Sequence, residues 1–153
     1  MPELPEVETV VRGLNRLILK KKIVKVKHDW PKSFPNAERD VQDFMIGAEI
    51  SNVRRRGKAI IIELENGWSL VTHLRMTGQM VYRGEKNWGA GHPNEDFLND
   101  LPNKSTRVEI DFEDETKLFF NDQRKFGYFK LMPKDEVEND SFIKKLGPEP
   151  LGV

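Results

Sequence analysis

Alternating apolar residues in the middle of the chain constrain its fold more than any other feature. Apolar or β-branched side chains recur at every second position on both sides of an Asn-Gly pair: Ile60, Ile62 and Leu64, then Asn66-Gly67, then Trp68, Leu70 and Thr72. Asn-Gly between two alternating runs is the strongest short-range signal of a β-hairpin. The same period of two returns at residues 108–112, 118–120 and 128–132, so we expect a largely β fold.

The N-terminal segment has the spacing of a helix instead. Its apolar residues fall at steps of three and four and form one stripe: Val7, Val10, Val11, Leu14, Leu17 and Ile18. Pro5 is tolerated in a first turn, and Glu3 and Glu6 suit the positive end of the helix dipole. Residues 41–45, which precede Gly47, predict a second, shorter helix.

These patterns together predict the architecture. Because strands outnumber helices, we expect a mainly β chain with helices: a two-layer β-sandwich (pseudobarrel) flanked by a long N-terminal α-helix and a second short helix. Residues 83–104 are rich in Gly, Pro and Asn, which predicts a long surface loop.

The composition is that of an ordinary globular chain. It has 153 residues, no cysteine, and 25 basic against 25 acidic side chains. This length predicts one domain, and the lack of cysteine excludes disulfides and thiolate metal sites. No apolar run approaches about 18 residues, and the start of the chain lacks a basic-then-apolar signal. We therefore expect a cytoplasmic protein that does not span a membrane.

The charges are unevenly distributed along the chain. A net charge of zero argues mildly against a nucleic-acid binder. Residues 12–32, however, hold eight basic side chains against one acid, Asp29, whereas residues 107–117 hold five acids. A neutral chain can therefore present one positive face.

Two residues at the N-terminus are candidates for covalent chemistry. If Met1 is removed, Pro2 carries a secondary amine, which can attack an aldehyde-like carbon and form an iminium. Glu3 beside it could transfer protons. The pattern alone favours a simpler interpretation, in which these residues only begin an acidic helix.

Three further segments are candidates for binding. Residues 54–58, Arg-Arg-Arg-Gly-Lys, occupy a predicted turn and could hold phosphates. Residues 122–127, Asp-Gln-Arg-Lys-Phe-Gly, could insert an apolar wedge and a cation into a duplex. Residues 73–78, His-Leu-Arg-Met-Thr-Gly, contain a lone histidine. Each has a structural alternative: a charged surface turn, a hairpin with one packed aromatic, and a satisfied histidine beside a core methionine.

The order of these motifs is more specific than any one of them. Residues 2–9, Pro-Glu-Leu-Pro-Glu-Val-Glu-Thr, resemble the start of the formamidopyrimidine-DNA glycosylase branch of the formamidopyrimidine-DNA glycosylase/endonuclease VIII family. Arg56-Gly57-Lys58, residues 73–78, residues 122–127 and residues 146–151 (Leu-Gly-Pro-Glu-Pro-Leu) follow in the order of that family. The resemblance spans the whole chain.

The resemblance implies base excision repair by a bifunctional DNA glycosylase/AP lyase, which removes oxidised purines such as 8-oxoguanine and formamidopyrimidines from damaged double-stranded DNA. The implied catalytic residues are Pro2 as the Schiff-base nucleophile, Glu3 as proton donor or acceptor, Glu6 in support, and Lys58 as a phosphate contact that assists β-elimination. The implied DNA-binding residues are Met76, Arg124 and Phe126, which fill the gap left by a flipped nucleotide, with His73, Arg56 and Arg107 beside phosphates.

Two departures from the family pattern matter. The family usually shows Lys-His-x-His before the strand at Val108, whereas Lys104-Ser105-Thr106-Arg107 stands here; Arg107 or His92 could replace the histidine missing at Ser105. Family members also continue into a helix–two-turn–helix domain and a zinc finger. We therefore expect residues 1–153 to be an N-terminal catalytic domain, monomeric and weak or inactive alone, with zinc only in the absent part.

Two alternative functions stay open. One is a damaged-DNA binding module without catalysis, since half of the site would be absent. The other is an unrelated enzyme that uses a terminal proline as a base, as proline tautomerases do, although no downstream motif matches that class.

Overall fold

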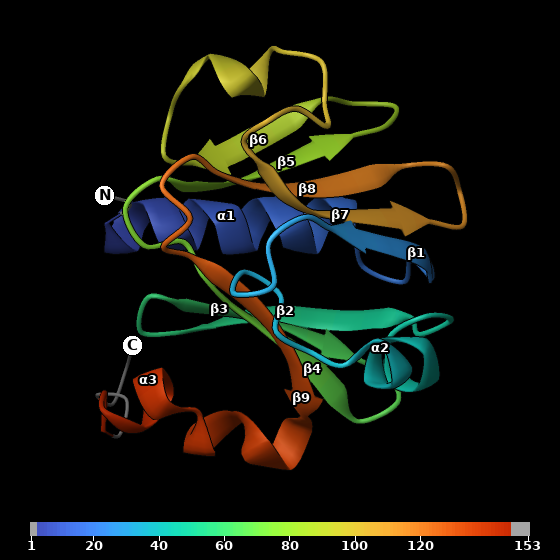
Figure 1. Cartoon of the computed structure of the whole chain (residues 1–153), viewed down its shortest axis with the longest axis vertical. Helices are drawn as coiled ribbons and strands as arrows, with labels where there is room; N and C mark the ends of the chain where they lie inside the picture. Colours follow the sequence, from blue (N-terminus) through green and yellow to red (C-terminus); the bar gives the residue numbers. More distant parts are fainter. Residues whose placement is uncertain (1–2, 148–153) are drawn as a thin grey trace.

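The computed structural model describes residues 3–147 and has two antiparallel β-sheets packed face to face (Figure 1). The five-stranded sheet has the order β1 (Ile23–His28), β7 (Thr106–Phe112), β8 (Lys117–Asp122), β5 (Gly78–Arg83), β6 (Trp88–Gly91). The four-stranded sheet has the order β2 (Ile50–Arg56), β3 (Ala59–Leu64), β4 (Trp68–His73), β9 (Tyr128–Pro133). The predicted two-layer sandwich is confirmed, and neither sheet closes into a barrel.

The long helix α1 (Leu4–Leu17) lies along one open side of the sandwich, against the edge strands β2 and β6 (Figure 1). The predicted apolar stripe faces the core, where Val10, Leu14 and Ile18 are fully buried. At Gly13 a Cβ atom would lie only 2.1 Å from the indole ring of Trp88 on β6. Glycine at this position therefore lets helix and strand approach closely.

The opposite open side is covered by the short helix α2 (Glu38–Phe44), which confirms the second predicted helix. The chain before it runs along the free edge of β9. There the amide of Asn36 donates to the carbonyl of Leu131 at 2.7 Å and accepts from its N–H at 2.7 Å. An unpaired strand edge invites wrong pairing, so this side chain protects it.

The prediction of one long surface loop at 83–104 is wrong for residues 88–91 and 95–97. Residues 88–91 form β6, which pairs with β5, and Glu95–Phe97 forms the 3₁₀-helix η1. The sequence Trp88-Gly89-Ala90-Gly91 does not indicate a strand, because two of its four residues are glycines. A Cβ at Gly89 would lie 2.6 Å from the ring of Phe97.

The last described residues pack on the outer face of the four-stranded sheet. The 3₁₀-helix η2 (Lys134–Asn139) and the short helix α3 (Ser141–Lys144) form a second, smaller core with β3 and β4. Its members are Ala59, Ile61, Val71, Val137 and Ile143. Within residues 3–147 no helix is long and apolar enough to cross a membrane.

Candidate functional site

Two connections between the sheets run past each other at one end of the sandwich. Residues 74–77 lead from β4 in the smaller sheet to β5 in the larger one, and residues 123–127 lead back from β8 to β9. Pairing of β4 with β9 and of β5 with β8 places His73 opposite Tyr128 and Gly78 opposite Asp122. The topology therefore brings two motifs about 50 residues apart in sequence to one place.

A buried carboxylate fixes these two loops to each other. Asp122, which is fully buried, accepts hydrogen bonds from the hydroxyl of Thr77 and from the N–H of Gly127. The Thr77 hydroxyl in turn accepts from the N–H of Arg124 at 3.1 Å. A Cβ at Gly127 would lie 2.7 Å from the carbonyl oxygen of His73, so only glycine fits this crossing.

The joined loops present large side chains to solvent. Met76 is 39% exposed and Phe126 is 52% exposed. The guanidinium of Arg124 lies 5.1 Å from the centre of the Phe126 ring, and Lys125 Nζ lies 4.4 Å from the ring centre of Trp30. The three residues predicted to enter a duplex are thus all at the surface of the two joined loops.

Each of these loops also holds one non-glycine residue in the left-handed region of backbone space. The φ angles are +56° at Arg75 and +60° at Lys125. Such conformations are unfavourable and cluster at functional sites, where the surrounding structure enforces them. Here the bonds around Asp122 supply that constraint.

The turn between β2 and β3 lies at the same end of the sandwich, since Ala59 pairs with His73. Gly57 has φ +60° at the first central position of this two-residue turn, where type II′ turns place glycine. Lys58 follows it, with its side chain 31% exposed.

Lys58 reaches the beginning of α1. Its Nζ atom lies 3.3 Å from Oε2 of Glu3, which is the N-cap residue of the helix. Glu3 accepts the first helical bonds through its carbonyl, from the N–H groups of Glu6 and Val7. Pro2, the predicted nucleophile, lies outside the described residues and directly precedes Glu3 in the chain.

Glu6 stands in the first turn of α1 and is half-buried. It lines a pocket of about 220 Å³ together with Thr9 and with residues 89–91 of β6. The structure therefore places Glu3, Glu6 and Lys58 at one end of the molecule, the end at which the two crossing loops lie (Figure 1).

His73 is buried, in contrast to the other residues predicted for this end. Its side chain is 3% exposed, its Nδ1 accepts from the N–H of Arg75 at 3.0 Å, and its ring meets Phe142 edge-on at 4.2 Å. Burial, with the nearby charges of Arg75 and Lys58, lowers the pKa of His73 to about 4. This placement favours the satisfied-histidine alternative, and its predicted phosphate contact stays a prediction.

Arg56 and Arg107 are also engaged inside the protein. Arg107 is 3% exposed, pairs with Asp29 at 3.2 Å and donates to the carbonyls of Lys104 and Ser105. Arg56 is 9% exposed and pairs with Glu138 at 3.2 Å. Both guanidinium groups are thus engaged inside the protein, which the sequence pattern did not indicate, and their predicted DNA contacts stay predictions.

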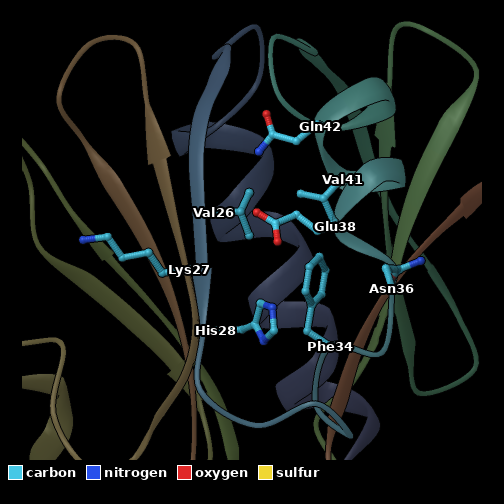
Figure 2. A pocket seen from close by; sticks show the side chains of 8 residues that line it. All are labelled: Val26, Lys27, His28, Phe34, Asn36, Glu38, Val41 and Gln42. Atoms are coloured by element: carbon cyan, nitrogen blue, oxygen red, sulfur yellow. The ribbon is translucent and has the colours of Figure 1, made fainter.

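A separate cavity of about 270 Å³ lies on the far edge of the sandwich, between β1 and α2 (Figure 2). Its lining includes Phe34, Glu38 and His28, and no residue predicted for the site.

Among residues 3–147 no group of three or more His, Asp or Glu side chains is placed to hold a metal ion.

The model of the family "Formamidopyrimidine-DNA glycosylase N-terminal domain" matches residues 1–129. The formamidopyrimidine-DNA glycosylase of Desulfitobacterium hafniense is 36% identical over 152 residues, which cover 99% of this chain and 50% of that protein. A solved structure of Lactococcus lactis formamidopyrimidine-DNA glycosylase bound non-covalently to DNA with an AP site is similar, with 31% identity, TM-score 0.78 and coverage of 97% of this chain and 52% of that one.

A further similar structure is of a complex with DNA that contains carbocyclic 8-oxo-G; it is 32% identical, with TM-score 0.78. The chain thus spans about half the length of the relatives it matches.

Proposed function

The chain belongs to the formamidopyrimidine-DNA glycosylase N-terminal domain family, and we propose on that basis that residues 1–153 are the catalytic domain of an enzyme that excises oxidised purines from double-stranded DNA. The relatives carry the glycosylase name, and the solved neighbours were bound to DNA with an abasic site or with a purine-lesion analogue. One observation in this chain carries the proposal. Glu3 and Lys58 lie at the same end of the sandwich as the two crossing loops with their exposed side chains.

The proposed reaction begins at Pro2. Its free amine attacks C1′ of the damaged nucleotide, and the bond from C1′ to the base breaks as the base takes up a proton. Ring opening of the sugar then gives an iminium between Pro2 and C1′, which accepts electrons when a proton leaves C2′ and the 3′ phosphate departs. This second part is the lyase activity that we propose in addition to base removal.

Glu3 and Lys58 have distinct proposed roles. Glu3 transfers protons at the opening sugar, because its carboxylate belongs to the residue next to the nucleophile. Lys58 binds a backbone phosphate, and its ammonium group is a mobile point charge suited to that contact. The distance of 3.3 Å between Nζ and Oε2 supports this proposal, because the two groups lie together at the beginning of α1.

The crossing loops supply the proposed means of extruding a nucleotide. Chemistry at C1′ of a nucleotide in a duplex requires that the nucleotide be flipped out, and another group must then fill its place in the base stack. Met76, Arg124 and Phe126 offer two apolar groups and one cation from a scaffold fixed by Asp122. An apolar wedge with a cation is a combination that proteins use to open a base step.

A single-turnover assay with excess protein tests this function. The substrate is a duplex with one 8-oxoguanine, and the products are free base and cleaved strand. We expect a low yield of both products from the chain without Met1, in keeping with the weak activity expected of residues 1–153 alone, and neither product from a Glu3→Gln variant that still binds the duplex. A chain that binds the lesion duplex but releases no base would instead be a damaged-DNA binding module, the second candidate.

A further inference from the structure

Arg56 stands directly before the turn that carries Lys58, and its charged group is held by the last described residues. Its guanidinium donates to Oε1 of Glu138, through Nε at 3.3 Å and Nη2 at 3.2 Å. It also donates to the carbonyl oxygen of Gly147. Arg56 on β2 therefore binds two acceptors, Glu138 and Gly147, that lie more than 80 residues further along the chain.

The same segment covers the turn itself. Gly57 lies beneath Leu146, whose Cδ1 atom would be 2.6 Å from a Cβ at that position. We call residues 134–147, which contain both Glu138 and Leu146, the strap. The turn is thus held on one side by the pairing of β2 with β3 and is covered on its outer side by the strap.

The strap is firmly attached to the sheet. Val137 and Ile143 are buried in the smaller core. The carboxylate of Asp140 accepts from the N–H groups of Phe142 and Ile143 at the start of α3, and pairs with Lys130 of β9 at 3.7 Å. A segment with an apolar anchor and a capped helix can hold a neighbouring turn in place.

We propose that Arg56 is a positioning residue: through Glu138 and Gly147 it fixes the turn at Gly57 so that Lys58 faces Glu3 and the proposed DNA-binding end. Lysine has a flexible stem, so the placement of its charge depends on how firmly its backbone is held. The planar fork of arginine can satisfy several acceptors at once, which a lysine at residue 56 would not do. This proposal rests on the proposed function only in assigning Lys58 a phosphate contact.

Replacing Glu138 by alanine tests this role, with Glu136→Ala as the matched control. Both residues lie on η2, but within residues 3–147 Glu136 accepts a hydrogen bond from Asn139, at 3.4 Å, and has none from Arg56. We expect Glu138→Ala to speed hydrogen exchange of the Arg56 and Ala59 amides, which close the turn, by about tenfold, since bonds to charged groups limit such local opening. Glu136→Ala should leave that exchange unchanged.

A second readout separates positioning from general stability. After reductive ¹³C-methylation, the NMR signal of Lys58, assigned with Lys58→Arg, should move when Glu3 is changed to Gln. It should move in the same direction in Glu138→Ala at a temperature where the variant is folded. Arg56→Lys, which keeps the charge but not the fork, should reproduce the effect.

Unchanged exchange and an unmoved Lys58 signal in folded Glu138→Ala and Arg56→Lys would overturn the proposal. If Glu138→Ala and Arg56→Lys both fail to fold, the contacts of Arg56 with the strap serve only stability, and this result also overturns the proposal. Neither readout requires DNA, so a chain that passes both tests but releases no base from damaged DNA would contradict the proposed function and leave the positioning role standing.

Discussion

Lys58 and Glu3 form an ion pair at the beginning of α1. Their side chains are 31% and 65% exposed, and pairs this exposed contribute under about 1 kcal/mol to stability. The pair therefore contributes little to holding the fold together. It does place one cation and one carboxylate at the beginning of α1, directly after Pro2 in the sequence.

We expect Lys58→Gln to weaken DNA binding without weakening the fold. If Lys58 contacts one phosphate, the slope of log affinity against log salt should fall by about 0.9 for duplex DNA. The melting temperature should hardly change, because the ion pair is exposed. Binding titrations at several salt concentrations, with a melting curve, check both points; an unchanged slope would remove Lys58 from the DNA interface.

His73 predicts a pH effect on stability. Its pKa is about 4 in the folded chain, below its ordinary value of 6.5, so the unfolded chain binds the proton more readily. Stability is therefore complete above pH 6.5 and is lost as the pH falls from 6.5 towards 4, by up to about 3 kcal/mol. His73→Asn, which keeps an acceptor near the place of Nδ1, should lose this dependence in urea unfolding at pH 7, 6 and 5. An equal loss of stability in both proteins would show that other groups cause it.

At the scale of elements, the two crossing loops form one unit. Each connects a strand of one sheet to a strand of the other, and Asp122 joins them through Thr77 and Gly127. Two independent loops with exposed Met76 and Phe126 would lose conformational entropy on entering a duplex. A preformed pair loses less, so the joint at Asp122 serves binding as well as folding.

Phe126→Ala should impair lesion binding more than stability. Phe126 is half exposed, so its truncation should cost far less than the roughly 3–5 kcal/mol of a buried phenylalanine. Phe129, three residues on and 1% exposed, is the matched control, and Phe129→Ala should show that large loss. Melting curves and binding to a duplex with an abasic analogue decide the matter. A large drop in melting temperature for Phe126→Ala, with unchanged binding per folded molecule, would contradict the wedge role.

Sequence periodicity predicted those elements in which apolar residues at a regular spacing face the main core. The stripe of α1 and the hairpin around Asn66-Gly67 are of this kind, and both are present. β6 could not be predicted because its signal is the fit of Gly13 against Trp88 and of Gly89 against Phe97, which exists only after folding. The short strap helices were missed for a related reason: their apolar residues are few and face a separate small core.

The candidate site was predictable to a similar extent. The motif order pointed to Lys58, Met76 and Phe126, and the structure places all three at the surface of one end. Sequence alone could not reveal that His73, Arg56 and Arg107 are buried, because a histidine or arginine in a turn or at a strand end has the same pattern whether it faces solvent or the interior. For the two arginines, burial depends on where the folded chain places their partners, Glu138 for Arg56 and Asp29 for Arg107.

At the scale of the whole molecule, the balanced total charge hides an uneven distribution. The basic residues of 12–32 lie on α1, on β1, in the segment between them and, for Lys32, just after β1, with Arg12, Arg16 and Lys25 exposed. The acids of 109–115 belong to β7 and its turn, where Glu109 and Asp111 are paired with Lys117. Acids paired internally repel DNA less than unpaired ones, so a neutral chain remains compatible with a DNA-binding face.

We expect DNA binding by the 153-residue chain to be weak and steeply dependent on salt. The cations available, Lys58 and Arg124 among them, act mainly through phosphates and counterion release, and each phosphate contact adds about 0.9 to the slope. Fluorescence anisotropy with a lesion duplex at several salt concentrations measures this. Tight binding that does not change with salt would show that apolar contacts dominate instead.

Covalent trapping on abasic DNA under borohydride, with the N-terminus defined by intact-protein mass spectrometry, tests the central proposal most directly. A retained Met1 makes the Pro2 nitrogen a tertiary amide without a reactive lone pair, so it cannot form an iminium. We predict a borohydride-dependent adduct at Pro2 when Met1 is absent and none when Met1 is present. Efficient trapping by protein that is entirely Met1-retained, or an adduct that maps to a lysine such as Lys58, would show that Pro2 is not the nucleophile.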